Sequence, residues 1–325
     1  MLRLPRFTLV AAHGAREAAT LVGGDERAML VAGGTDLFPN MKRRQATPST
    51  LVSLAKVPGL AGIRNGTGLR IGALTTLATV VAPPNAGAGY AALAPAPALV
   101  STPQLRNMGT LGGNLCLDTR CNWYDQSAFW RAAEGYCMKT NAEVVCRVAP
   151  SSRRCLAVAS ADTVPALLVL GAKVRITGAS GEREADLGEL YREDGIRYLT
   201  LARGEVVTEI VLPPTDGWRS TYLKMRDRGS FDFPIAGVAA AIRMEGGRVA
   251  QARVALTALG SQPELVAGAA AAIVGTAHDD AANAAAAAAC HTAARPMDNT
   301  SGSISQRKRA ARVLTERALR ELRGH

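Results

Sequence analysis

The chain has 325 residues, of which 48% are hydrophobic and only 4% aromatic, so it can bury a sizeable core of small aliphatic side chains. Its net charge is +11, but the basic residues are spread along the chain, few aromatic side chains are available to stack on bases, and no nucleic-acid motif is present. No apolar run approaches the roughly 18–20 residues of a membrane-spanning helix, and Pro5 and Arg6 interrupt the stretch where a signal peptide would need its apolar region. We therefore expect a cytoplasmic protein that binds neither nucleic acid nor membranes.

The first 100 residues predict an α+β arrangement. A helix is expected over 12–22, and short strands over 28–32 and 51–54, with a glycine turn between the two strands. Residues 60–80 resemble a β-meander that ends in a helix start at Thr75-Thr76. The Ala-rich stretch 88–100 is expected to be helical only in part, because prolines interrupt it.

The later part of the chain predicts further α+β structure and then a small sheet with helices. A helix and a strand are expected at 164–169 and 172–176, and another strand at 206–212. Three strands follow at 221–226, 236–244 and 248–258, with Gly246-Gly247 as a hairpin turn. Helices are expected at about 264–274, 279–295 and 304–323. The most plausible domain boundary is the proline-containing linker 213–218.

The last predicted helix carries the densest basic run, Gln306-Arg-Lys-Arg-Ala-Ala-Arg. Leu314, Leu319 and Leu322 recur at helical spacing and provide an apolar face. We interpret this segment as a helix with a solvated or partner-facing basic side.

Two glycine turns are candidate phosphate cradles. They are Gly33-Gly34-Thr35-Asp36 and Gly109-Thr110-Leu111-Gly112-Gly113-Asn114, about eighty residues apart. Without a Cβ atom, glycine lets backbone N–H groups converge on an anion, and the threonines add hydroxyl donors. Neither turn is a Rossmann fingerprint or a P-loop, and one such turn alone would be better explained as an ordinary tight turn. Two of them fit a diphosphate held from both sides.

Five of the six cysteines lie within forty residues. The last four are spaced Cys121-x15-Cys137-x8-Cys146-x8-Cys155, and Cys116 precedes them beside the second glycine turn. The clustering indicates metal ligation, whereas a disulfide scaffold is not expected in a cytoplasmic chain of this size. The spacing fits neither structural zinc nor ferredoxin patterns, so it leaves iron–sulfur, zinc and unliganded core thiols open. Basic side chains near the thiols could offset the charge of a thiolate cluster: Arg120, Lys139, Arg147, Arg153 and Arg154.

Histidine offers no catalytic site. It occurs only as His13, His278, His291 and His325, none with ligand spacing, and no GxSxG motif is present. The chain therefore favours a redox relay over hydrolysis.

The motifs together resemble the FAD-binding subunit of molybdenum hydroxylases, the xanthine dehydrogenase and CO dehydrogenase flavoprotein family. The resemblance is carried by Ala32-Gly-Gly-Thr-Asp-Leu37, Ile71-Gly-Ala-Leu-Thr-Thr76 and Gln104-Leu-Arg-Asn-Met-Gly-Thr-Leu-Gly-Gly-Asn114. It continues through Ala161-Asp162, Glu209-Ile-Val-Leu-Pro213, Tyr222-Leu-Lys224 and Ala236-Gly-Val-Ala. The family implies an α+β fold with a two-part FAD-binding domain over 1–215, split at about 58/59, and a C-terminal antiparallel sheet with helices over 216–325.

The resemblance also implies which residues bind FAD. Both glycine turns would hold the diphosphate, and Asp162 and Lys224 occupy positions where the family contacts the flavin. The implied cofactor-binding residues are Leu30, Val31, Ala32, Gly33, Gly34, Thr35, Asp36, Leu37, Thr76, Thr110, Leu111, Gly112, Gly113, Asn114, Asp162 and Lys224.

The cysteine-bearing segment, about 116–158, is absent from most of that family. It is similar to the insertion in the flavoprotein subunit of 4-hydroxybenzoyl-CoA reductase, which binds a [4Fe–4S] cluster. On that resemblance Cys121, Cys137, Cys146 and Cys155 are the ligands, and Cys116 is left out.

That likeness implies a complete enzyme. Electrons from reduced ferredoxin would pass through the cluster and FAD to two [2Fe–2S] clusters on a small subunit, and then to a molybdopterin-binding large subunit that dehydroxylates 4-hydroxybenzoyl-CoA to benzoyl-CoA. We expect a dimer of heterotrimers, with no catalytic residue on this chain. Two alternatives remain: the FAD subunit of an oxidising molybdenum hydroxylase, and a metal-binding interaction protein whose glycine turns are only structural.

Overall fold

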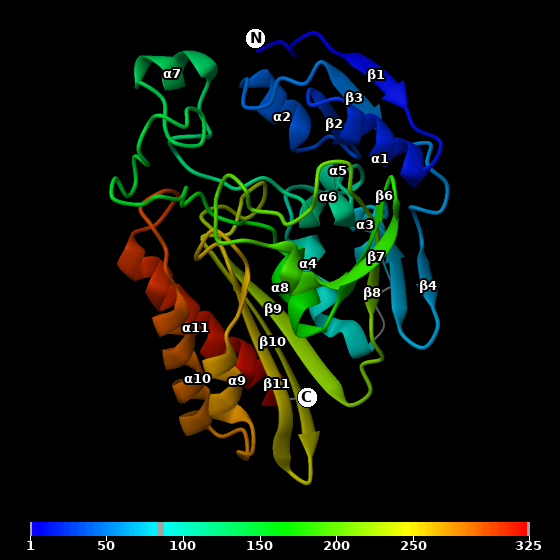
Figure 1. Cartoon of the computed structure of the whole chain (residues 1–325). Helices are drawn as coiled ribbons and strands as arrows, with labels where there is room; N and C mark the ends of the chain where they lie inside the picture. Colours follow the sequence, from blue (N-terminus) through cyan, green and yellow to red (C-terminus); the bar gives the residue numbers. More distant parts are fainter. Residues whose placement is uncertain (1, 83–87, 324–325) are drawn as a thin grey trace.

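The computed structural model describes residues 2–82 and 88–323. Within these residues the strands form a three-stranded, a five-stranded and a four-stranded sheet. Figure 1 shows the N-terminal sheet at one end of the molecule and the C-terminal sheet with its helices at the other. The five-stranded sheet lies between them, beside the segment that carries the second glycine turn.

The N-terminal sheet is parallel, in the order β1-β3-β2. Parallel strands need crossover connections: α1 connects β1 to β2, and α2 connects β2 to its neighbour β3. Helix α1 buries Ala18, Ala19 and Val22 in the N-terminal core. The elements are β1 (Thr8–Ala11), α1 (Ala15–Gly24), β2 (Ala28–Val31), α2 (Leu37–Lys42) and β3 (Thr50–Ser53).

The five-stranded sheet is antiparallel, in the order β4-β5-β8-β6-β7. Its strands are β4 (Ile63–Asn65), β5 (Leu69–Gly72), β6 (Lys173–Gly178), β7 (Gly181–Asp186) and β8 (Val206–Leu212). The helices between them are α3 (Leu77–Val81), η1 (Ala88–Leu93), α4 (Pro95–Ala98), α5 (Pro103–Arg106), α6 (Leu111–Leu115), α7 (Ala128–Ala133), α8 (Thr163–Val169) and η2 (Leu187–Leu190). All seven residues of α8 are buried, and α8 packs in the core shared by the five-stranded sheet and the C-terminal sheet. In contrast, α7 belongs to the cysteine-bearing segment and lies beside the end of α2, where Arg131 bonds to the carbonyls of Arg43 and Arg44.

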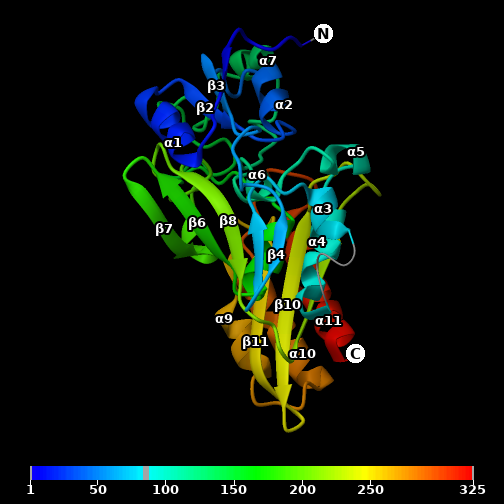
Figure 2. The ribbon, with the colours of Figure 1, turned by 90° about the vertical axis from the view of Figure 1, so that its right-hand side faces the viewer.

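The C-terminal sheet is antiparallel, in the order β12-β11-β10-β9. Side chains alternate across a strand, so Val238 and Ile242 of β10 face the core under the C-terminal helices while Ala239 and Ala241 face the core that contains α8. Both faces of this sheet are therefore covered, and Figure 2 shows α9, α10 and α11 lying along it. The elements are β9 (Trp218–Met225), β10 (Ala236–Glu245), β11 (Arg248–Thr257), β12 (Glu264–Leu265), α9 (Ala267–Ile273), α10 (Asp280–Ala293) and α11 (Ile304–Arg323).

The α+β expectation is confirmed, with several differences: the short helices α2, α5, α6 and α7 were not predicted, and Glu264–Leu265, expected to begin a helix, form strand β12 instead. Strands β1 and β7 were not foreseen, and the first helix begins three residues later than expected. The basic helix α11 is not uniformly solvated, because Arg307 is fully buried. In the part of the chain that the structure describes, no helix is long and apolar enough to cross a membrane.

Candidate functional site

The first glycine turn connects β2 to α2. Gly34 adopts φ +70°, a left-handed conformation that favours glycine, and its carbonyl accepts a hydrogen bond from the N–H of Phe38. Gly33 is required for a different reason: a Cβ atom on it would overlap the backbone carbonyl of Met108, just before the second turn. Glycine therefore lets the two turns touch.

The second glycine turn begins helix α6. Thr110 is the N-cap residue, and its hydroxyl oxygen accepts a hydrogen bond from the N–H of Gly113 at 3.1 Å. A Cβ atom on Gly112 would lie 2.7 Å from the Cβ of Ala73, so this glycine allows α6 to pack against the residue that follows β5. A β-bridge joins Thr110 to Thr76, which caps α3.

The two turns predicted from the sequence are thus brought together. The hydroxyl oxygen of Thr35 is 3.4 Å from the position that a Cβ atom on Gly109 would take. Asn114 also has a structural task, because its side-chain oxygen accepts hydrogen bonds from the N–H and the hydroxyl of Thr163 at 3.2 and 2.6 Å. This contact anchors the start of α8 beneath the second turn.

Asp162 and Lys224 form a buried ion pair behind the turns. The Lys224 ammonium donates to Asp162 Oδ2 at 2.9 Å and to the carbonyls of Leu99 and Asp232 at 3.0 and 2.8 Å. The Tyr222 hydroxyl donates to Asp162 Oδ1 at 2.7 Å. The three donor hydrogens of Lys224 are therefore engaged, and a contact between its ammonium and a flavin would displace one of these bonds.

Burial dominates the ionisation of this pair. It raises the pKa of Asp162 to about 6, even though Lys224 and Tyr222 act in the opposite direction. Burial likewise lowers the pKa of Lys224, although Asp162 opposes the shift. The sequence analysis quoted Tyr222 within the Tyr222-Leu-Lys224 motif but gave it no role. Tyr222 lies two residues before Lys224 in β9, so the two side chains lie on the same face of the sheet.

The four cysteines implied by the resemblance line one pocket. Cys121, Cys137, Cys146 and Cys155 are each 6–7% exposed, and their neighbours in the lining include Trp123, Tyr124, Met138, Lys139 and Arg147. Cys116 lies elsewhere, against the core of the second sheet, and Cys290 is buried in α10. All six are free thiols. Among the described residues, no three His, Cys, Asp or Glu side chains form a site for a metal ion.

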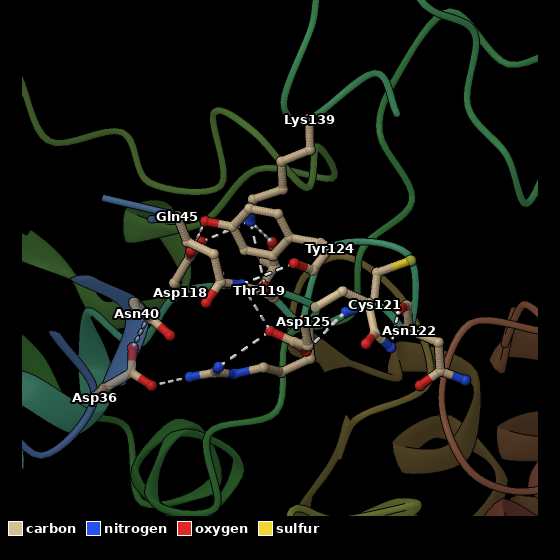
Figure 3. A network of polar contacts seen from close by, with 12 residues as sticks. Asp36, Asn40, Gln45, Asp118, Thr119, Cys121, Asn122, Tyr124, Asp125 and Lys139 are labelled. Carbon is tan, nitrogen blue, oxygen red and sulfur yellow. Dashed lines mark hydrogen bonds and ion pairs between the residues drawn. The ribbon is translucent and has the colours of Figure 1, made fainter. Parts of the chain in front are cut away.

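A buried cation lies beside the thiol pocket (Figure 3). The ammonium of Lys139 donates to Asp118 Oδ1 at 2.6 Å and to the Thr119 hydroxyl at 2.5 Å, and it lies 4.3 Å from the centre of the Tyr124 ring. Lys139 opposes the effect of burial on Cys155, but burial dominates and raises the pKa of that thiol to about 11. Of the other basic side chains suggested by the sequence, Arg147 lines the pocket, whereas Arg154 pairs with Glu193 at the surface.

Comparisons with known proteins assign the family. Residues 5–215 match the family model described as the FAD binding domain in molybdopterin dehydrogenase, and residues 220–322 match the CO dehydrogenase flavoprotein C-terminal domain. The chain belongs to the FAD-binding subunits of the molybdenum hydroxylase family. The flavoprotein fold expected from the resemblance is therefore confirmed.

Individual relatives agree with this assignment. The chain is 30% identical over 303 residues to the carbon monoxide dehydrogenase medium chain of Afipia carboxidovorans, covering 92% of this chain and 90% of the relative. It is 33% identical over 266 residues to the aldehyde oxidoreductase FAD-binding subunit PaoB of Escherichia coli, covering 77% and 81%. A solved structure of carbon monoxide dehydrogenase from Hydrogenophaga pseudoflava superposes with a TM-score of 0.81 at 28% identity, covering 99% of each chain.

Proposed function

We propose that this chain is the FAD-carrying electron-transfer subunit of an oxidising enzyme of the molybdenum hydroxylase type, with the substrate site on a partner subunit. The observation that carries the proposal is the contact between the two glycine turns in a chain of this family. The relatives are called carbon monoxide dehydrogenase and aldehyde oxidoreductase, and these names favour the oxidising alternative over the reductive dehydroxylation of 4-hydroxybenzoyl-CoA.

The residues of the two turns would hold the cofactor. Backbone N–H groups around Gly33–Thr35 and at the start of α6 would bind the FAD diphosphate, with the hydroxyls of Thr35, Thr76 and Thr110 as further donors. Asp162 and Lys224 would shape the cofactor site indirectly, because their ion pair joins the start of α8 to β9. FAD, once bound, exchanges electrons singly or in pairs. We place this site in an FAD-binding domain over 1–215, followed by a C-terminal domain over 216–325.

The partners follow from the family. We propose a complex with a molybdopterin-binding large subunit and a small subunit that carries two [2Fe–2S] clusters, assembled as a dimer of heterotrimers. Ferredoxin was expected as the electron donor of a reductive enzyme. The oxidising enzyme proposed here instead passes its electrons to an external acceptor.

We propose further that Cys121, Cys137, Cys146 and Cys155 hold a [4Fe–4S] cluster. A mononuclear zinc site needs its sulfurs to converge to about 2.3 Å from a single point. Here the four thiols line one shared pocket. A multinuclear cluster spaces its thiolates around its own core, and the buried Lys139 would offset part of their negative charge.

The visible spectrum and substrate turnover of the complex test the function. The complex purified with its partner subunits should contain FAD, and carbon monoxide or an aldehyde should bleach the flavin absorbance. Reductive dehydroxylation of 4-hydroxybenzoyl-CoA with reduced ferredoxin, without oxidation of those substrates, would overturn the oxidising proposal.

Metal analysis of anaerobically purified protein tests the cluster. Iron and acid-labile sulfide should be present in equal amounts and should fall sharply in Cys121→Ser. The matched control Cys116→Ser should keep them. Stoichiometric zinc, or iron at background in the wild-type protein, would contradict the proposal.

A further inference from the structure

The cysteine-bearing segment holds helix α2 at both ends. At the start of α2, Asp36 forms an ion pair with the guanidinium of Arg120. Beyond the end of α2, Arg131 donates to the carbonyls of Arg43 and Arg44 at 3.1 and 3.0 Å. Because Asp36 is part of the first glycine turn, the segment fixes the helix that this turn leads into.

Both arginines are buried, with Arg120 5% and Arg131 4% exposed. Arg120 also pairs with Asp125 at 3.4 Å and lies 4.5 Å from the centre of the Phe233 ring. A buried charge that loses its partner is strongly destabilising, so these contacts restrict how the segment can move relative to α2.

The same contacts position the lining of the thiol pocket. The backbone N–H of Cys121, next to Arg120, donates to Asp125 Oδ2 at 3.2 Å. Gln45, just after α2, donates to the carbonyl of Tyr124 at 3.0 Å and to Asp125 Oδ1 at 3.1 Å. Tyr124 and Cys121 both line the pocket. Their placement and that of α2 are therefore set by one shared group of bonds.

We propose that Arg120 and Arg131 are positioning residues that couple the thiol pocket to the FAD cradle, so that an intact pocket strengthens FAD binding and bound FAD orders the pocket. The inference rests on the proposed binding of FAD at the two turns. If FAD binding has already ordered α2, ordering of the thiol pocket costs less free energy, and the reverse also holds. Each event therefore favours the other by the same factor. Cys121 follows Arg120 directly in the sequence and lines the pocket, so a change in the pocket should reach Arg120 through this cysteine.

A double-mutant cycle on the full chain tests the coupling. FAD dissociation constants are measured by fluorescence for the wild type, Cys121→Ser, Arg120→Met and the double variant. Cys121→Ser should weaken FAD binding on the order of tenfold, within the range typical of coupled sites. In the Arg120→Met background the same change should alter the constant by less than about twofold, since coupled residues are not additive.

The controls separate coupling from general damage. Cys116→Ser changes a thiol outside the pocket, and Arg183→Met breaks a surface ion pair with Glu205, so both should leave FAD affinity unchanged. If the Arg120→Met variant does not fold, Gln45→Leu replaces it in the cycle. Gln45 is half-buried, and its replacement removes the hydrogen bonds that connect the residues after α2 to Tyr124 and Asp125.

Each remaining outcome is decisive. FAD binding that is unchanged by Cys121→Ser would overturn the coupling while leaving the proposed function intact. An undiminished effect of Cys121→Ser in the Arg120→Met background would overturn the role of Arg120. Failure of the wild-type chain to bind FAD would instead overturn the proposed function, and the coupling with it.

Discussion

The backbone carbonyl of Met108 occupies the space that a Cβ atom on Gly33 would need. This single relationship joins two turns that are about eighty residues apart in the sequence. Neither partner can give way easily, because the carbonyl belongs to the backbone that leads into the second turn. The absence of a side chain at Gly33 is therefore a requirement for assembling the proposed cradle.

Gly33→Ala should separate the two turns. We expect a loss of about 1–3 kcal/mol in the free energy of unfolding, as for overpacked sites, and at least a tenfold loss of FAD affinity. Urea unfolding and FAD titration measure the two effects. Gly24→Ala, at the end of α1 with open space around it, is the matched control and should be neutral or slightly stabilising. Full FAD affinity in Gly33→Ala would contradict a role for the turn contact.

Asp162 should make stability depend on pH. Its pKa in the folded protein is raised to about 6 from a usual value of 3.8, so the folded state binds more protons between these values. The contribution of Asp162 to stability is therefore greatest at low pH and decreases as pH rises from about 4 to 6, by on the order of 1–3 kcal/mol.

The comparison with Asp162→Asn isolates this contribution. The stability of the wild type minus that of Asp162→Asn, from urea unfolding, should decrease over that pH interval. A difference that increases with pH would mean that the attraction of Lys224 outweighs burial and holds the pKa of Asp162 below its usual value.

Arg307 should be the most sensitive basic residue of α11. It is fully buried and donates to the carbonyls of Ala258, Met297 and Ile235, linking three segments of the C-terminal domain. Arg307→Met should lower the free energy of unfolding by about 3–5 kcal/mol, because several buried acceptors lose their donor. The exposed Arg312 is the control, and Arg312→Met should change stability by no more than about 0.5 kcal/mol. Equal effects would show that burial of Arg307 contributes little.

Two ion pairs of the cysteine-bearing segment should differ greatly in value. Lys139 is buried against Asp118, whereas the pair of Arg154 with Glu193 is at the surface. Lys139→Met should cost about 3–5 kcal/mol and Arg154→Met no more than about 1 kcal/mol. Thermal unfolding of both variants, made in the same background, provides the comparison. A stable Lys139→Met variant would remove the case for a structurally required cation beside the thiols.

Much of the fold could be predicted because its signals are local. The hairpin of β10 and β11 follows from two alternating apolar runs joined by Gly246-Gly247, and α11 follows from its leucine spacing. Strand β7 could not be predicted in this way, because its sequence Gly-Glu-Arg-Glu-Ala-Asp has no apolar alternation and lies at a sheet edge. Strand β1 is only four residues long, and its place depends on pairing with β3.

The candidate site was predicted unevenly for the same reason. The glycine turns could be recognised individually, but the residues that join them to the cysteine-bearing segment are distant in sequence. Arg120 lies 84 residues from Asp36, and Gln45 lies 79 residues from Tyr124. Cysteine spacing could not choose among five thiols, whereas the folded chain groups four of them and separates Cys116.

The enclosure of Asp162 has a consequence for the order in which the chain can fold. Its partners Tyr222 and Lys224 both belong to β9, beyond residue 215. A fragment that ended at residue 215 would lack both partners of this carboxylate, and α8 would lose the sheet against which it packs. We therefore expect the N-terminal part to complete its packing only when the C-terminal sheet is present, and a flavin-loaded fragment of residues 1–215 is not expected to accumulate.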